Sequence, residues 1–159
     1  MIEVATNTQS AYETERNKPM PSLNHSLIQM NIGTELRNRY KKVYSIASEL
    51  SLDLSNWSSV PDICIFPKTA LDLQNDVIAM TMPPLCAIEI PASTQPLYDV
   101  VSQTRAYFSH GVSSCWIVML PLDHIYVFSA PDEYEIYRSN QTLVDTVLDI
   151  SIPLKEVFE

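Results

Sequence analysis

Three short apolar runs constrain the fold of this chain most strongly. They occupy residues 62–66, 85–90 and 115–120. Runs of this length, apolar at successive positions, are typical of strands with other elements packed on both faces. Pro67 and Pro91 end the first two runs, since proline removes a donor from the strand ladder. The runs therefore predict a sheet that is covered on both sides.

Two segments have helical character. After Ser22, a typical N-cap residue, apolar side chains recur at helical spacing and predict an amphipathic helix over 23–42. A second helix is predicted from Pro96 to about His110, because proline suits the first turn and Gly111 is a typical C-terminal stop. Residues 1–21 are polar and predict an extended arm.

Further strands are expected on either side of the second helix. Residues 43–54 alternate in polarity and predict one long or two short half-buried strands, with a turn over 56–60. Residues 67–84 predict a long connection. The runs at 125–128, 134–137 and 147–152 predict more strands in a meander, and 154–159 one helical turn. This order of elements predicts an α/β or α+β fold with a mixed sheet between helices.

Composition limits the class of protein. A chain of 159 residues fits one domain, 1–159. No apolar run approaches the roughly 20 residues needed to span a bilayer, and the N-terminus lacks a secretory pattern, so no membrane and a cytoplasmic location are expected. Three cysteines without a CxxC motif predict buried free thiols, and two glycines exclude a glycine-rich phosphate loop.

The charge distribution leaves one question open. A net charge of −9 argues against a general nucleic-acid coat protein, because phosphate attraction needs basic surface. Arg37, Arg39, Lys41 and Lys42 nevertheless gather at the end of the first predicted helix. They suit either the helix dipole at a solvated end or a local patch that contacts phosphate.

Two carboxylates belong to the apolar runs. Asp62 begins the first run and Glu89 lies late in the second. A carboxylate in a buried strand is costly to desolvate unless it is paired or holds a cation. If the two strands are neighbours, both side chains can reach one edge of the sheet and bind Mg²⁺, which would activate a water for phosphodiester cleavage. Local hydrogen bonding at two strand ends is the alternative.

An ordered set of residues resembles a known family. The set is Pro61-Asp62, Ala87-Ile88-Glu89-Ile90-Pro91-Ala92-Ser93, Asp99-x3-Gln103-x3-Tyr107-x3-Gly111-Val112 and Cys115-Trp116-Ile117-Val118. It resembles the Uma-type family of restriction-endonuclease-like proteins, within the PD-(D/E)XK nuclease superfamily. The resemblance implies a mixed sheet flanked by helices and a nuclease centre with Mg²⁺ or Mn²⁺ on Asp62 and Glu89. It also implies DNA as a partner, is compatible with a homodimer, and draws attention to Glu13, His25 and Tyr107.

The chain departs from this family at the lysine. Pro91 stands at the superfamily position, and Gln103 stands at the helical position that this family uses, one turn before Tyr107. A glutamine can orient a water through its amide, but it cannot give the cationic stabilisation of a lysine. Two hypotheses follow: a metal-dependent endonuclease, weakened by Gln103, or a catalytically degenerate member that serves as a dimeric binding or regulatory protein.

Overall fold

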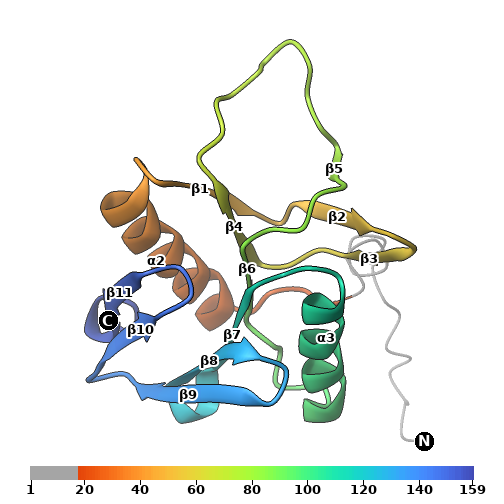
Figure 1. The fold of residues 1–159 in the computed structure, drawn as a ribbon. Coiled ribbons are helices and arrows are strands. Elements are labelled where there is room, and N and C mark those ends of the chain that lie inside the picture. Colours follow the sequence, from red (N-terminus) through yellow and green to blue (C-terminus); the bar gives the residue numbers. More distant parts are fainter. Residues whose placement is uncertain (1–17) are drawn as a thin grey trace, which may run out of the picture.

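The computed structural model describes residues 18–159 and has the mixed α+β architecture predicted from the sequence (Figure 1). Its helices and strands are α2 (Leu23–Tyr40), β1 (Tyr44–Ser48), β2 (Ser51–Leu54), β3 (Trp57–Ser59), β4 (Ile63–Pro67), β5 (Ala79–Met80), β6 (Cys86–Glu89), α3 (Leu97–Ser109), β7 (Ser114–Met119), β8 (His124–Ala130), β9 (Glu133–Arg138), β10 (Thr142–Asp145) and β11 (Ile150–Pro153). Two short 3₁₀ turns, η1 (Leu120–Leu122) and η2 (Leu154–Glu156), follow β7 and β11.

A six-stranded sheet forms the centre of the molecule, in the order β1-β4-β6-β7-β8-β9. Strands β6 and β7 are parallel, and the other neighbours are antiparallel. A parallel pair needs a crossover connection, which α3 provides. The predicted mixed sheet is confirmed. The predicted meander is confirmed for β7, β8 and β9, whereas its last run, 147–152, belongs to the separate β10–β11 sheet.

The central strands are apolar throughout because both faces of the sheet are covered. In β4, Ile63 and Ile65 join a core cluster with Ile32 of α2. Cys64 and Phe66, on the opposite face, join a second cluster with residues of α3 and of β2. The two helices accordingly lie on opposite sides of the sheet (Figure 1). Side chains of either parity are therefore buried, which removes the polar–apolar alternation of a one-sided sheet.

Helix α2 begins where the sequence predicts. The Ser22 hydroxyl oxygen accepts a hydrogen bond from the backbone N–H of His25, so Ser22 is the N-cap. His25 lies in the first turn with its side chain buried. Leu27, predicted to belong to the apolar row, is exposed, whereas Ile28, Ile32 and Leu36 are buried.

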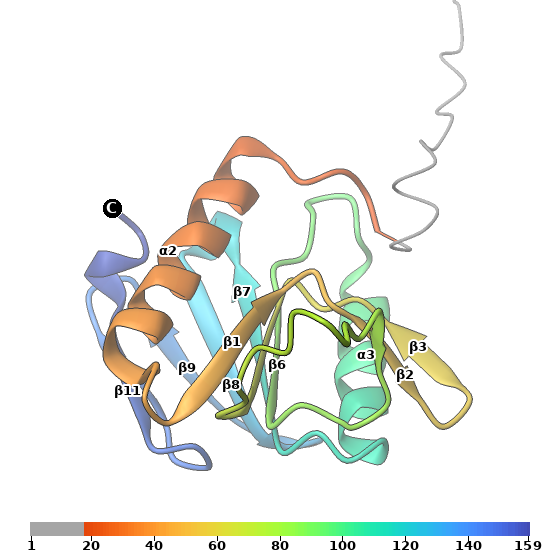
Figure 2. The same ribbon diagram turned by 90° about the horizontal axis from the view of Figure 1, so that it is seen from above.

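Two small sheets, of which β11, β2 and β3 are labelled in Figure 2, add residues to the two core clusters. The β10–β11 hairpin contributes Leu143, Ile150 and Ile152 to the cluster under α2. The three-stranded sheet β3-β2-β5 contributes Leu52 and Leu54 to the cluster under α3.

The predicted turn over 56–60 is wrong. Residues Trp57–Ser59 form β3, which pairs with β2 through a short connection at Ser55 and Asn56. Both connecting residues have positive φ, 49° for Ser55 and 69° for Asn56. A tight hairpin turn between twisted strands requires this conformation. A Ser-Asn pair without glycine is a weak turn signal, so the hairpin is not evident from the sequence.

The predicted strand over 147–152 is wrong in its first half. Strand β11 starts at Ile150, after a turn in which Asp149 has a φ of 56°. Its partner β10 was not predicted. The buried carboxylate of Asp145 fixes the turn by accepting hydrogen bonds from the backbone N–H groups of Val147 and Leu148.

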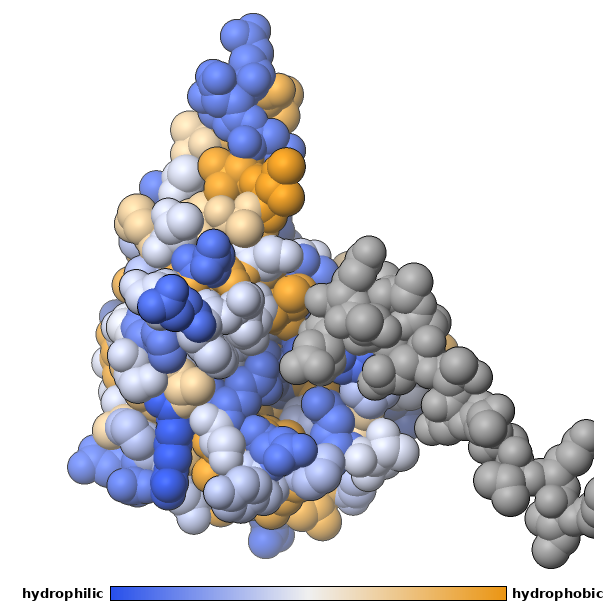
Figure 3. Space-filling model, turned by 90° about the vertical axis from the view of Figure 1, so that its right-hand side faces the viewer, coloured by the Kyte–Doolittle hydropathy of each residue, from blue (hydrophilic) through white to orange (hydrophobic). Residues whose placement is uncertain are grey.

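The predicted connection after β4 includes the short strand β5. Before it, the chain projects from the body of the molecule (Figures 1 and 3) and exposes Leu71, Leu73 and Ile78. The three cysteines are buried free thiols, as predicted. Within residues 18–159, no helix is long and apolar enough to cross a membrane.

Candidate metal centre

The carboxylates of Asp62 and Glu89 lie together at one end of the sheet. Strands β4 and β6 pair with Ile63 opposite Ile88, and one residue further in this register Asp62 stands opposite Glu89. The backbone N–H of Ile90 donates a 2.7 Å hydrogen bond to Oδ2 of Asp62. Asp62 is fully buried and Glu89 is 6% exposed. The two acids, far apart in the sequence, thus end on the same rim.

A third carboxylate extends this row. Strands β1 and β4 pair with Ser48 opposite Ile63, so Glu49 stands opposite Asp62 one residue further along. Its backbone N–H donates a 3.1 Å hydrogen bond to the Asp62 carbonyl oxygen. Glu49 has a φ of 53°, which ends the strand at this residue. Glu49, Asp62 and Glu89 therefore lie side by side at the same end of three neighbouring strands.

A lysine joins two of these acids. Nζ of Lys18 lies 2.7 Å from Oε2 of Glu89 and 3.4 Å from Oδ1 of Asp62. The residue is only 7% exposed. It belongs to the coil before α2, 71 positions from Glu89. Its ammonium occupies a position that two carboxylates share.

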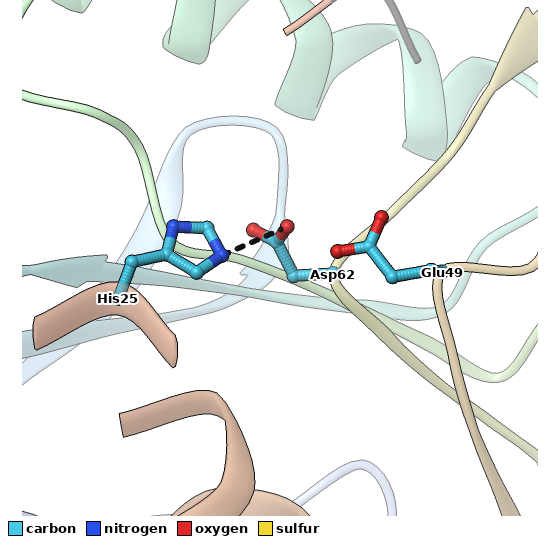
Figure 4. A group of neighbouring side chains, drawn as sticks. All are labelled: His25, Glu49 and Asp62. Atoms are coloured by element: carbon cyan, nitrogen blue, oxygen red, sulfur yellow. Dashed lines mark ion pairs between the residues drawn. The ribbon is translucent and has the colours of Figure 1, made fainter. Parts of the chain in front are cut away.

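Helix α2 brings an imidazole and an amide to the same site. Nε2 of His25 lies 3.3 Å from Oδ1 of Asp62 and 3.0 Å from the side-chain oxygen of Gln29. The Gln29 amide nitrogen donates a 2.9 Å hydrogen bond to the Asp62 carbonyl oxygen. Figure 4 shows the imidazole of His25 pointing toward the Asp62 carboxylate, with Glu49 on the other side. One ligand atom each from His25, Glu49 and Asp62 lies within 4.8 Å of the others, close enough to share a cation.

Helix α3 reaches Glu89 through a chain of hydroxyl groups. The Tyr107 hydroxyl donates a 2.6 Å hydrogen bond to Oε1 of Glu89 and lies 2.7 Å from the Ser59 hydroxyl. The Gln103 amide nitrogen donates to Oγ of Ser59 at 3.1 Å. Asp99, Gln103 and Tyr107 share one face of the helix, as their spacing predicts. Gln103 is thus connected to Glu89 through two intervening side chains.

Burial and pairing affect the two central carboxylates differently. Burial raises the pKa of Glu89, and the nearby ammonium of Lys18 offsets this only in part. Burial would also raise the pKa of Asp62. The hydrogen bond from His25, the charge of Lys18 and the Ile90 N–H together outweigh burial, so the pKa of Asp62 lies below its usual range. Asp62 is therefore the more strongly ionised member of the pair.

The site borders a cavity. A space of about 530 Å³ is lined by Lys18 and Pro19, by β3 and the residues after it, and by the polar face of α3, including Asp99 and Gln103. Its lining combines side-chain hydroxyl and amide groups with apolar residues. This is a size typical of small-molecule sites, so a nucleotide-sized group could approach Lys18 from this side.

The structure places most of the predicted site residues together. Asp62, Glu89, His25 and Tyr107 meet as described, while Gln103 contacts Ser59 and reaches the acids only through it. Glu13 lies outside the described residues. Arg105 is exposed and pairs with Asp132, away from the acids, as its helical position predicts.

Sequence reasoning missed Lys18, Glu49 and Ser59. Lys18 is a basic residue in a polar segment, and no local pattern marks it as part of a site. Glu49 had a weak signal, because it ends an alternating run directly before a new strand. Ser59 was assigned to a turn. Each of the three is brought to the site by strand pairing or by the path of a coil.

The basic cluster lies at the opposite end of α2 from His25, and its Arg37 lines a cavity of about 430 Å³ together with Gln29 and Glu49. His25 lies in the first turn of the helix and Arg37 in the last. Slightly more than three turns separate them, or roughly 18 Å along the helix axis. Nε of Arg39 pairs with Oε2 of Glu35 at 2.9 Å. Among residues 18–159, none of the four basic residues pairs with Asp62 or Glu89.

Comparison with known proteins gives the family. The model of the Uma2 family, described as "Putative restriction endonuclease", matches residues 7–155. The chain belongs to the Uma2 family. Its fold is also that of a crystal structure described as a putative nuclease of DUF820 from Anabaena variabilis. The two share 21% sequence identity with a TM-score of 0.75, over 89% of this chain and 83% of that one. No protein of curated function shows significant sequence similarity to the chain.

This match confirms the predicted family and fold. The Uma2 assignment covers nearly all of the chain, including every described residue of the carboxylate site. The likeness to the Anabaena structure shows that the mixed sheet with helices on both faces is a restriction-endonuclease-like fold. A nuclease-like function follows at the level of the family.

Proposed function

We propose that this protein is a metal-dependent endonuclease that hydrolyses phosphodiester bonds in DNA, with Asp62 and Glu89 as ligands for Mg²⁺ or Mn²⁺. One observation carries the proposal: two buried carboxylates on neighbouring strands share a single cation position. The Lys18 ammonium stands there, 2.7 Å from Glu89 and 3.4 Å from Asp62.

The donor set fits a hard divalent cation. Mg²⁺ takes one or two carboxylates and keeps several waters, and carboxylate and water ligands also suit Mn²⁺. Asp62 and Glu89 supply the carboxylates, and Glu49 and His25 stand beside Asp62 within reach of the same region. A bound cation would lower the pKa of a water and polarise the phosphoryl oxygen.

The protein holds these ligands in fixed orientations. The N–H of Ile90 binds Oδ2 of Asp62, and the hydroxyl of Tyr107 binds Oε1 of Glu89. Each carboxylate is thereby left with its other oxygen, Oδ1 or Oε2, directed to the shared cation position. Such outer contacts orient ligands and contribute to metal affinity.

Calorimetric titration with Mn²⁺ tests the ligand assignment. We expect wild type to bind Mn²⁺ and both Asp62→Ala and Glu89→Gln to lose most of that binding. Asp53→Ala, which removes an exposed aspartate of β2, is the matched control and should bind as wild type does. Equal titration curves for wild type and the Asp62 variant would remove the metal site from the proposal.

Cleavage of supercoiled plasmid DNA in Mn²⁺ tests the activity. The same two variants should lose cleavage, and the control should keep it. If wild type binds Mn²⁺ but leaves DNA intact at all enzyme concentrations, the nuclease proposal fails while the metal site stands.

A second candidate is a degenerate member that binds a partner without cleaving DNA. The neutral Gln103, which donates to Ser59 rather than to either acid, favours this alternative. The variant Gln103→Lys distinguishes the endonuclease from the degenerate binding protein. A gain of DNA cleavage would mean that the wild-type site is inactive because it lacks a cation at this position. The homodimer and the cytoplasmic location stay predictions.

A further inference from the structure

We propose that Lys18 is a catalytic residue of this site, whose ammonium contacts the phosphodiester group undergoing cleavage. This inference rests on the proposed function and assigns a role to a residue outside the α3 motif. The coil before α2 would then deliver the cation that Gln103 does not provide.

The burial of Lys18 shows a specific placement. An ammonium is costly to bury unless it is paired. Lys18 is 7% exposed and has two carboxylates in range. A buried ion pair is rarely more stable than apolar residues of the same size, so stability alone is a weak reason to keep it. Its location between the carboxylates of Asp62 and Glu89 gives a stronger reason.

Lys18 reduces the negative charge of the row. When ionised, Glu49, Asp62 and Glu89 together carry three negative charges, of which a divalent cation neutralises two. The Lys18 ammonium offsets one more. Its removal would make the loaded row more negative by one unit and less favourable for the phosphodiester anion, an effect that is strong where solvent is excluded.

Lys18 also faces the space through which a substrate can approach. It lines the cavity of about 530 Å³ beside Ser59 and Gln103, while its Nζ contacts the acids. One side chain thus connects the open cavity to the carboxylates. Within residues 18–159, no other lysine or arginine pairs with Asp62 or Glu89.

The ammonium would act on charge that develops during the reaction. Attack of water on phosphorus forms the new P–O bond as the bond to the leaving oxygen breaks, and negative charge grows on the phosphoryl oxygens. The Lys18 ammonium, moved aside by the bound metal but still beside the carboxylates, would stabilise that charge. The attacking water loses its proton and the leaving oxygen gains one, so no oxidant, reductant or co-reactant besides water is needed.

The first test compares cleavage with metal binding. Lys18→Gln should lower Mn²⁺-dependent cleavage about 100-fold or more, a loss typical for one charge-stabilising donor. Mn²⁺ binding should be retained or tightened, because the ammonium no longer competes for the carboxylates. Lys68→Gln, at an exposed lysine after β4, is the control and should leave both unchanged.

A double variant places the cation elsewhere. Adding Gln103→Lys to Lys18→Gln puts an ammonium on the face of α3 that already connects to Glu89 through Ser59 and Tyr107. We expect part of the lost cleavage to return. No recovery, in a folded double variant that binds Mn²⁺, counts against a role that depends on charge.

A binding measurement does not depend on turnover. In Ca²⁺, the affinity for a short DNA duplex should fall for Lys18→Gln. The logarithm of the association constant falls linearly with the logarithm of the salt concentration. For Lys18→Gln this slope should decrease in magnitude by about one, which indicates the loss of a single phosphate contact. An unchanged slope would contradict the phosphate contact even if the protein were inactive as a nuclease.

The outcomes separate the two proposals. Wild type that neither binds Mn²⁺ nor cleaves DNA overturns the proposed function. Wild type that cleaves, with Lys18→Gln cleaving equally well, overturns only the role of Lys18. If Lys18→Gln loses cleavage and at the same time loses Mn²⁺ binding or thermal stability, Lys18 forms a structural ion pair. That result would also overturn the catalytic role of Lys18.

Discussion

The hydroxyl of Tyr107 donates a 2.6 Å hydrogen bond to Oε1 of Glu89, joining helix α3 to the carboxylate row. Tyr107 is buried at 1% exposure, and its ring meets the ring of Trp57 edge-on. Burial and the neighbouring Glu89 raise the pKa of Tyr107 well above its usual value, so the hydroxyl stays a donor. The packing of α3 on the sheet thereby fixes the orientation of Glu89.

Removing this hydroxyl should affect both stability and metal binding. Tyr107→Phe leaves Glu89 with one donor fewer in a buried place and should lower the free energy of unfolding by about 1–3 kcal/mol. Mn²⁺ affinity should fall about 10-fold or more, as for other outer contacts of a ligand. Urea unfolding and calorimetry measure the two effects. Tyr137→Phe, whose hydroxyl donates to the exposed Val144 carbonyl, should change neither.

The buried carboxylate of Asp145 should be the most sensitive polar group away from the site. It accepts hydrogen bonds from the Ser114 hydroxyl at 2.5 Å, from the Trp116 indole N–H at 2.8 Å, and from two backbone N–H groups. Asp145→Ala leaves these donors without a partner and should cost at least about 3 kcal/mol by urea unfolding.

The control for this variant is Asp132→Ala. The Asp132 side chain is 82% exposed and pairs with Arg105 at the surface. Such exposed pairs contribute little to stability, about 1 kcal/mol at most. Similar losses for the two variants would contradict the structural role of Asp145.

The two glycines should respond to alanine with opposite signs. Gly33 lies inside α2 with nothing within 4 Å of an added Cβ. Gly33→Ala should therefore stabilise by about 0.5–1 kcal/mol. Gly111 has a φ of 94°, and an added Cβ would lie 3.1 Å from Cγ of Pro83. Gly111→Ala should destabilise by about 1 kcal/mol or more. Thermal unfolding of both variants measures this, and a shift of the same sign would refute it.

Acid should remove the contribution of Asp62 to stability. The pKa of Asp62 is lower in the folded protein than its ordinary value of 3.8. Its contribution is therefore present above that ordinary value and lost as the pH falls through the folded value. The stability difference between wild type and Asp62→Asn should thus be largest near neutral pH and shrink in acid. A difference that grows with acid would reverse the assigned direction.

The cysteines should be unreactive in the folded protein. Burial raises the pKa of Cys64 to about 12, and it also raises the pKa of Cys86 and Cys115. A thiol reagent at about pH 8 should label none of the three until denaturant is added, when all three should react.

The raised pKa values of the three thiols also affect stability at high pH. Thiols whose pKa is raised on folding hold their protons more tightly in the folded state. Stability should therefore fall as the pH rises above about 8.5, the ordinary thiol pKa, toward about 12. Cys64→Ser should weaken this dependence in urea unfolding measured across the alkaline range.

Much of the site could be predicted because its ligands lie on the strands that define the core. Asp62 and Glu89 stand out as acids in apolar runs, and their strands pair as neighbours. Tyr107 follows from helical spacing. Glu49 was missed because its side chain joins the carboxylate row only when β1 pairs with β4. The alternation of polar and apolar residues predicts a strand, but it does not predict which strand will be its neighbour.

The sequence by itself determined the sheet, the two helices on its faces and the pair of carboxylates, because buried strands and helices leave periodic apolar patterns. Only the tertiary structure decided which cation those carboxylates meet. Lys18 lies 44 positions from Asp62 and 71 from Glu89 along the chain, in a coil without periodicity. The reason is physical: a charge is placed by the path of the backbone and by the desolvation of its partners, and neither leaves a local pattern.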